Sequence, residues 1–348
     1  MRLWVNFIMK KIYIFTCIAL TAALLTAKIQ AADWKTLHLN DTYYEVCALK
    51  LLLRHRNYDP GEIHNTFNKQ TLEALVFFQE DNNLNPDGVT GPETWRKLIT
   101  PVSDSKDLEG INDAVKAVQY LLINKYGFTA LEVDGTFDVR TKAAILLFQH
   151  NYKLGTNGTN GMDGIAGEKT WLHLIQDSRK SEHCNWVICV ELNKDRGSAG
   201  MLYVFDAAGF QLASMPCLGE SMTMNTNWRE QFANTPLGCF RAAISHVQRN
   251  PIEYGIYNSI ELNDADVKAV TDGRFGILIH SGNTKFKNKS DTKMPNKFKE
   301  HRARTIDGLD QTHGCIRISD ADHAVLYEIL KNHTKGIVSI SEQDVYTN

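Results

Sequence analysis

The sequence predicts a multidomain protein in which two small all-α domains precede a β-rich domain. Helix-like segments recur at 71–79 and 141–149, and each places apolar side chains at i, i+3 and i+4. After residue 186 the pattern changes to strand-length apolar runs separated by Gly and Asn turns. With 348 residues and 43% hydrophobic content, the chain is long enough for two or three separate cores.

Residues 1–31 have the pattern of a secretory signal peptide. Two lysines precede the apolar run 12–27, and a pair of alanines at the end offers a cleavage site. We therefore expect a periplasmic or secreted protein with no membrane attachment after cleavage. An uncleaved anchor remains an alternative because Ile29 matches the cleavage motif less well than alanine, and Met9 is an alternative start.

Two copies of one helical unit are expected at residues 43–100 and 111–176. In each copy a glycine turn leads into a helix that carries a tryptophan, Trp95 or Trp171. Their positions in an apolar stripe predict that both are core residues rather than sugar-stacking platforms. The repeat resembles the three-helix peptidoglycan-binding domain often fused to wall-modifying enzymes, although Asn65 replaces a turn glycine in the first copy. The resemblance implies that peptidoglycan is the partner.

The net charge and the cysteines of the chain bear on which partners and which covalent links are expected. A formal net charge of −2 gives no global electrostatic case for a nucleic-acid partner. The cysteines that follow the signal segment are Cys47, Cys184, Cys189, Cys217, Cys239 and Cys315. The sequence allows disulfides between Cys184 and Cys189 or between Cys217 and Cys239 but fixes neither, so we interpret these residues as buried thiols by default.

The β-rich domain is expected at residues 186–348. Its strands are predicted at 186–192, 201–205 and 240–244, which are apolar or alternate in polarity. Ser319 can cap a closing helix, because acidic residues and then an apolar stripe follow it.

Residues 312–317 read Thr-His-Gly-Cys-Ile-Arg and have the composition of a nucleophile site. A thiolate attacks acyl groups well when a base or a positive field lowers its pKa, and a glycine lets backbone N–H groups close on an oxyanion. His280 ends an apolar stretch that can deliver an imidazole to the Cys315 sulfur. Cys315 and His280 have an alternative interpretation as a buried thiol and a polar residue with purely structural roles. That interpretation accounts for each residue separately but not for the order of the motifs along the chain. A zinc site is disfavoured because no ligand-pair spacing supports it.

Three ordered motifs resemble the L,D-transpeptidase (YkuD) family: Thr-Pro-x-Gly-x-Phe at 235–240, the strand-end histidine, and the Thr-His-Gly-Cys run. The resemblance covers roughly residues 186–341. It implies that Cys315 is the nucleophile and that His280 is its general base, oriented through the backbone carbonyl of Ser281.

The same resemblance assigns the other candidate site residues. His313 would shape the nucleophile turn, and the backbone N–H groups of Gly314 and Cys315 would form the oxyanion hole. Arg317 and Asn283 are the candidate substrate-binding residues. Arg317 would hold a carboxylate of the substrate, and a structural ion pair is an equally good explanation of this arginine. No metal and no cofactor is implied.

The stretch between His280 and Thr312 contains thirty-one residues, more than the family pattern has. Its basic residues, opposed only by Asp291 and Glu300, are Lys285, Lys287, Lys289, Lys293, Lys297, Lys299, Arg302 and Arg304. A solvated loop and a lid that attracts carboxylate-bearing peptides explain this charge equally well.

The expected function is that of an exported, monomeric cell-wall cysteine acyltransferase. The family implies an L,D-transpeptidase that acts on peptidoglycan stem peptides. If water were the acceptor, the same site would act as an L,D-carboxypeptidase or peptidoglycan hydrolase. A secreted toxin that attacks cell walls would be one such hydrolase. A catalytically silent wall-binding protein is the remaining alternative.

Overall fold

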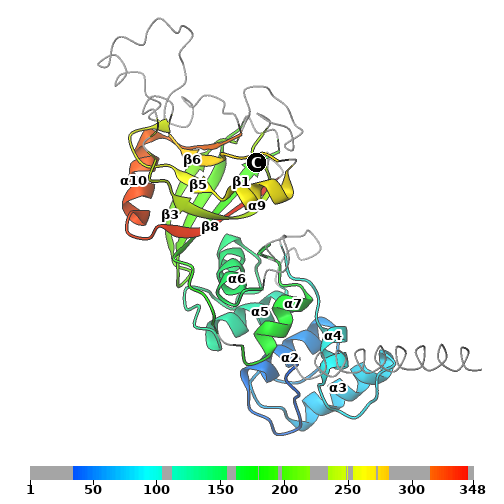
Figure 1. Cartoon of the computed structure of the whole chain (residues 1–348). Helices are drawn as coiled ribbons and strands as arrows, with labels where there is room; N and C mark the ends of the chain where they lie inside the picture. The colour runs from blue at the N-terminus through cyan, green and yellow to red at the C-terminus, as the bar shows by residue number, and fades with distance from the viewer. Residues whose placement is uncertain are drawn as a thin grey trace, which may run out of the picture. The chain divides into compact units, whose positions relative to one another are not determined.

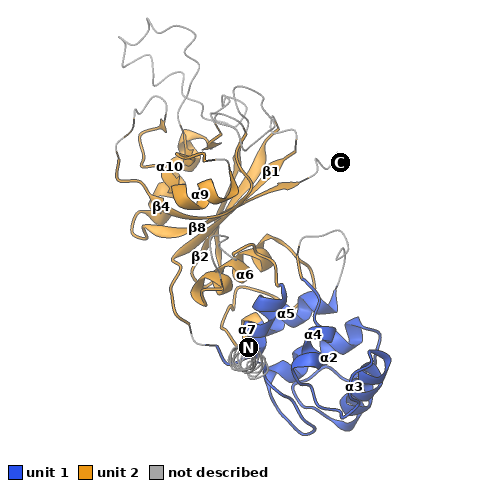
Figure 2. Cartoon of the chain, turned by 45° about the vertical axis from the view of Figure 1, so that its right-hand side comes forward, with its two compact units in different colours: residues 1–101, 112–121, 167–178 blue, residues 102–111, 122–166, 179–348 orange. Residues whose placement is uncertain are grey.

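The computed structural model describes residues 34–103, 112–154, 162–178, 180–194, 198–219, 234–247, 249, 254–271, 273–281 and 314–343. The predicted signal segment lies outside these residues. No helix in the described ranges is long and apolar enough to cross a bilayer. The chain divides into two compact units, one of residues 1–101, 112–121 and 167–178, the other of residues 102–111, 122–166 and 179–348 (Figure 2).

The N-terminal half of the described chain is helical, as predicted. The first copy of the repeat contributes α2 (Tyr44–His55), α3 (Lys69–Asp81) and α4 (Pro92–Leu98). The second copy contributes α5 (Asp113–Asn124), α6 (Val139–Asn151) and α7 (Glu168–Ile175). Equivalent side chains cap the middle helices, since Asn68 accepts a hydrogen bond from the Thr71 N–H and Asp138 accepts one from the Thr141 N–H.

One glutamine in each copy ties the middle helix to the glycine turn. The Gln79 side-chain amide donates to Asp87 and its oxygen accepts from the Gly88 N–H, and Gln149 makes the same two bonds to Asp163 and to the Gly164 N–H. The glutamine of the repeat motif therefore has a structural role. It satisfies turn groups that would otherwise be buried without partners.

Both repeat tryptophans are core residues, as predicted. Trp95 and Trp171 are fully buried. Each indole N–H donates to a backbone carbonyl, that of Lys35 or that of Thr100, at 2.8 Å. Their faces are therefore not exposed for stacking on sugars.

The C-terminal half of the described chain is built on one eight-stranded sheet, which confirms the predicted β-rich domain (Figure 1). The strands are β1 (Trp186–Asn193), β2 (Gly200–Asp206), β3 (Gln211–Cys217), β4 (Gly238–Ile244), β5 (Ile260–Leu262), β6 (Leu278–His280), β7 (Ile316–Arg317) and β8 (Lys335–Gln343). Their order in the sheet is β3-β2-β1-β8-β4-β5-β6-β7, with parallel pairs at β1–β8 and β6–β7. The two short strands β6 and β7 lie at one end of this order, where His280 ends β6 and Cys315 immediately precedes β7.

Two helices accompany the sheet, α9 (Asp264–Val270) and α10 (Asp320–Leu330). Leu326 and Leu330 of α10 belong to the same core cluster as the apolar side chains of the strands. The predicted cap of α10 is present, because the Ser319 hydroxyl accepts from the Asp322 N–H. Helix α10 thus fixes the residues that follow β7 against the sheet.

The core side of the sheet is tightly packed around Trp186. Its indole N–H donates to the His333 carbonyl at 2.6 Å, and its ring lies over Gly336. A Cβ placed on Gly336 would be 2.1 Å from the Trp186 ring, so any larger residue there must displace it.

The opposite side of the sheet buries two thiols. Cys189 on β1 and Cys239 on β4 both have Ser339 of β8 as their cross-strand partner, and α6 packs against β1. The described cysteines are all free of disulfides, which confirms the interpretation as thiols. Burial raises the pKa of Cys184 and of Cys189 to about 12, so both are inert near neutral pH.

Candidate active site around Cys315

Cys315 lies immediately before β7, at the end of a turn that requires glycine. Gly314 has φ +96°, in the left-handed region that a side chain disfavours. The thiol is nearly buried, with an exposed fraction of 8%, and its sulfur lies 3.8 Å from the Gly276 carbonyl oxygen. The glycine of the motif therefore sets the backbone direction from which the sulfur projects.

His280 and Cys315 lie on the same side of the sheet. Strands β6 and β7 run parallel and pair Ile279 with Ile316, whose side chains both enter the core. Because side chains alternate along a strand, His280 and Cys315 project to the opposite side, diagonally across the two strands. The fold thus brings together two residues that are separated by more than thirty positions in the sequence.

The imidazole of His280 is held in one tautomer. Its Nδ1 lies 2.7 Å from the Ser281 carbonyl oxygen, the contact expected from the sequence. A carbonyl can only accept, so Nδ1 carries the proton and Nε2 keeps its lone pair. His280 is buried, with the Tyr254 ring 4.9 Å away between centroids. The arrangement leaves Nε2 as the nitrogen that can take a proton from a thiol.

The Thr-Pro-x-Gly-x-Phe segment is bonded to the nucleophile segment. The buried Thr235 hydroxyl lies 3.2 Å from the Cys315 carbonyl oxygen and 3.1 Å from the Gly219 carbonyl oxygen. Leu218 and Arg317 then exchange two backbone hydrogen bonds of 2.9 Å. These contacts give a physical reason why the segment accompanies the cysteine motif along the chain.

Burial decides the protonation state of the resting site. Burial and, after it, the charge of Arg317 lower the pKa of His280 from 6.5 to about 3. Burial also raises the pKa of Cys315, against the lowering effect of a Leu278 backbone bond and of Arg317, Arg274 and Arg249. The sequence led us to expect a lowered thiol pKa. The thiol of Cys315 and the imidazole of His280 are instead both neutral near neutral pH.

Arg274 is a site residue that the sequence analysis missed. Its side chain is 2% exposed, and its Nη1 donates to the Asn234 carbonyl oxygen at 2.7 Å. Its charge acts on the Cys315 thiol. In the sequence, Arg274 lies shortly before the strand that ends in His280, but it belongs to none of the motifs.

Two predicted site residues lie outside the described residues. They are His313, expected to shape the nucleophile turn, and Asn283, a candidate for substrate binding. The basic insertion lies outside them too. Arg317 is among the described residues. It lies opposite His280 in the pairing of β6 with β7, and it is 3% exposed.

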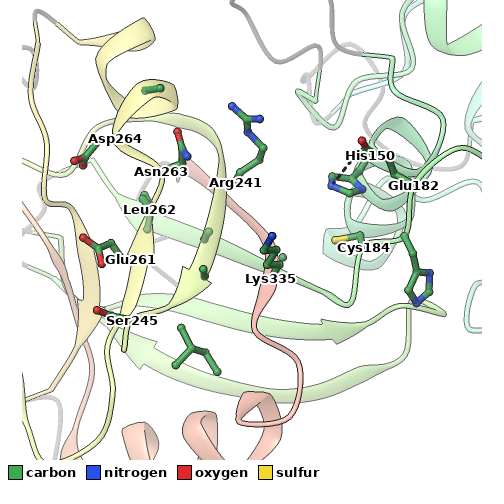
Figure 3. Close-up of a pocket in the computed structure, with 16 residues that line it drawn as sticks. His150, Glu182, Cys184, Arg241, Ser245, Glu261, Leu262, Asn263, Asp264 and Lys335 are labelled. Carbon is green, nitrogen blue, oxygen red and sulfur yellow. Dashed lines mark ion pairs between the residues drawn. The ribbon is translucent and has the colours of Figure 1, made fainter. Parts of the chain in front are cut away.

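A groove of about 810 Å³ lies elsewhere in the same unit, lined by residues of β4, β5, β8 and α6 (Figure 3). Its Arg241 is bound by the Asp266 carboxylate at 2.6 Å, and its His150 lies 3.7 Å from Glu182. None of the three motifs lines it, so we place the active site at Cys315 and not in this larger hollow.

The fold is a strand-rich domain that carries the cysteine and histidine motifs and follows two helical domains. Consistent with this arrangement, the family model for a putative peptidoglycan binding domain matches residues 42–98 and 112–174, and that for the L,D-transpeptidase catalytic domain matches residues 197–338. The chain therefore carries a catalytic domain of the L,D-transpeptidase (YkuD) family, preceded by two peptidoglycan-binding domains.

Two solved structures are similar to the chain at low identity. A crystal structure of the L,D-transpeptidase from Xylanimonas cellulosilytica is 17% identical with a TM-score of 0.26, covering 65% of this chain and 92% of its own. A fused Zn-dependent amidase/peptidase/peptidoglycan-binding domain protein from Clostridium acetobutylicum is 14% identical with a TM-score of 0.22, covering 88% of this chain and 100% of its own.

The pKa of His280 predicts an acid sensitivity of the fold. Between about pH 6.5 and about pH 3 the unfolded chain binds a proton at this histidine and the folded chain does not, so acidification through this window favours unfolding. We expect the free energy of unfolding to fall less across this window in His280→Asn than in the parent, as measured by urea unfolding at several pH values. An identical pH dependence in the two proteins would mean that His280 is not buried in its neutral form.

Proposed function

We propose that this protein is an exported L,D-transpeptidase that joins peptidoglycan stem peptides through a thioester on Cys315. The observation that carries the proposal is the tautomer of His280, whose Nδ1–H bond to Ser281 leaves the lone pair on Nε2, on the side of the sheet where Cys315 projects. The family match supports the reaction class, and the two binding domains support peptidoglycan as the partner.

The first half-reaction transfers the stem peptide to the enzyme. The Cys315 thiol attacks the carbonyl carbon of the L,D peptide bond while Nε2 of His280 takes the thiol proton. The N–H groups of Gly314 and Cys315 are the proposed donors to the oxyanion that forms. The C–N bond then breaks, His280 returns the proton to the leaving amine, and the terminal D-amino acid departs. A thioester remains on Cys315.

The second half-reaction regenerates the thiol. The amine of another stem peptide attacks the thioester carbon and gives a proton to His280, and the C–S bond breaks as a new peptide bond forms. The sulfur recovers its proton from His280. Burial keeps His280 neutral down to low pH, so the lone pair of Nε2 is available and the resting site holds no preformed ion pair.

Mass spectrometry of wall fragments after incubation with the purified protein tests the proposal. We expect cross-linked dimers that have lost one terminal D-amino acid per link formed. Stem peptides shortened by one residue without new links would indicate an L,D-carboxypeptidase, and loss of existing links would indicate a hydrolase or wall-targeting toxin. Unchanged fragments would favour a silent wall-binding protein and contradict the assignment.

A further inference from the structure

The hydroxyl of Ser281 is held by two side chains of α10. Its Oγ lies 2.7 Å from Asp320 Oδ1 and 2.9 Å from His323 Nδ1. The other ring nitrogen of His323 lies 3.2 Å from the Asn258 carbonyl oxygen. Ser281 and His323 are both essentially inaccessible to solvent. The residue whose carbonyl orients His280 is therefore anchored to a helix through its side chain.

The surrounding backbone is shaped to admit this contact. Gly255 has φ +81°, and a Cβ placed on it would be 2.1 Å from Ser281 Oγ and 3.1 Å from His323 Nδ1. The Tyr257 ring meets the His323 ring edge-on, with centroids 5.6 Å apart. The Ser281 hydroxyl is thus enclosed, and a rotation away from α10 would leave buried polar groups without partners.

We propose that Asp320 and His323 are positioning residues that, by fixing Ser281, hold the imidazole of His280 in its active orientation. The inference rests on the proposed function and extends it to α10. His323 lies close enough to His280 for their charges to interact, and Arg317 and Arg249 act on the same His280 imidazole. The Tyr257 ring packs against His323, and Tyr327 packs against Tyr257. None of these neighbouring residues needs to bind substrate for Asp320 and His323 to position Ser281.

Substitutions at His323 test the positioning role. We expect His323→Leu to lower kcat by about 10- to 100-fold with KM nearly unchanged, because a misplaced base slows the chemical step rather than substrate binding. His323→Asn keeps a donor toward Ser281 and should recover most of the loss. The matched control is Leu326→Ala, which removes a buried α10 side chain without touching Ser281 and should lower Tm but not kcat.

A second measurement separates this proposal from the proposed function. The alkylation rate of Cys315, followed on its own peptide near neutral pH, should fall in His323→Leu even if the parent protein turns over no stem peptide. An unchanged kcat and alkylation rate in His323→Leu would overturn the proposal.

Discussion

Cys315→Ala is expected to lose acyl transfer almost completely, with kcat/KM lower by on the order of 10⁵-fold. The thiol supplies the atom that bonds to the stem peptide. Burial raises the pKa of the other described thiols, Cys47, Cys184, Cys189, Cys217 and Cys239, and none of them lies in the Thr-His-Gly-Cys motif. The measurement is the rate of dimer formation from a soluble stem peptide.

Two controls separate chemistry from folding in this experiment. Cys315→Ala should still sediment with insoluble peptidoglycan, since the proposed wall-binding domains are unchanged. Cys217→Ala, which truncates another buried thiol of the same sheet, should keep its turnover. If Cys315→Ala retains parental turnover, the nucleophile is another group.

His280→Ala is expected to lower kcat/KM by about 10²- to 10⁴-fold, the range that a general base contributes. Its remaining thiol should alkylate slowly near neutral pH, because burial raises the pKa of Cys315 and the base that takes its proton is gone. Alkylation of the Cys315 peptide and steady-state turnover are measured on the same protein.

A more conservative variant isolates the base from the fold. His280→Asn retains a side-chain donor for the Ser281 carbonyl but has no basic nitrogen, so it should be as inactive as His280→Ala. His333→Ala removes an exposed histidine of the same unit and should be neutral. A parental alkylation profile in both His280 variants would exclude His280 from the role.

Local patterns predicted most of the secondary structure. The strands expected at 186–192, 201–205 and 240–244 fall within β1, β2 and β4, and the predicted cap at Ser319 begins α10. These elements are predictable because their periodicity and capping residues are local in the sequence. The exposed strand β3 was not predicted, since its first residues carry no buried face.

Long-range contacts account for what the sequence analysis missed. The bond from Thr235 to the Cys315 carbonyl spans 80 positions, and nothing near either residue predicts it. His323 looked like an ordinary polar residue of an amphipathic helix, and its function depends on where Ser281 lies. The contact between α6 and β1 likewise joins a helical repeat to the sheet within one compact unit, which periodicity cannot show.

The balance of charges at the nucleophile also required the structure. The sequence places a cationic residue two positions after Cys315, which suggested a lowered thiol pKa. Burial outweighs the arginines and raises it instead. Desolvation depends on how many atoms surround the sulfur, a quantity that only the folded chain defines.

The most direct test of the account is intact-protein mass spectrometry after brief mixing with a tetrapeptide stem and no acceptor. We expect the protein to gain the mass of the donor minus the mass of the free terminal D-amino acid, and peptide mapping should place the thioester on Cys315. Cys315→Ala should gain nothing under the same conditions. An adduct on another residue, or turnover without any adduct on the parent protein, would contradict covalent acyl transfer through Cys315.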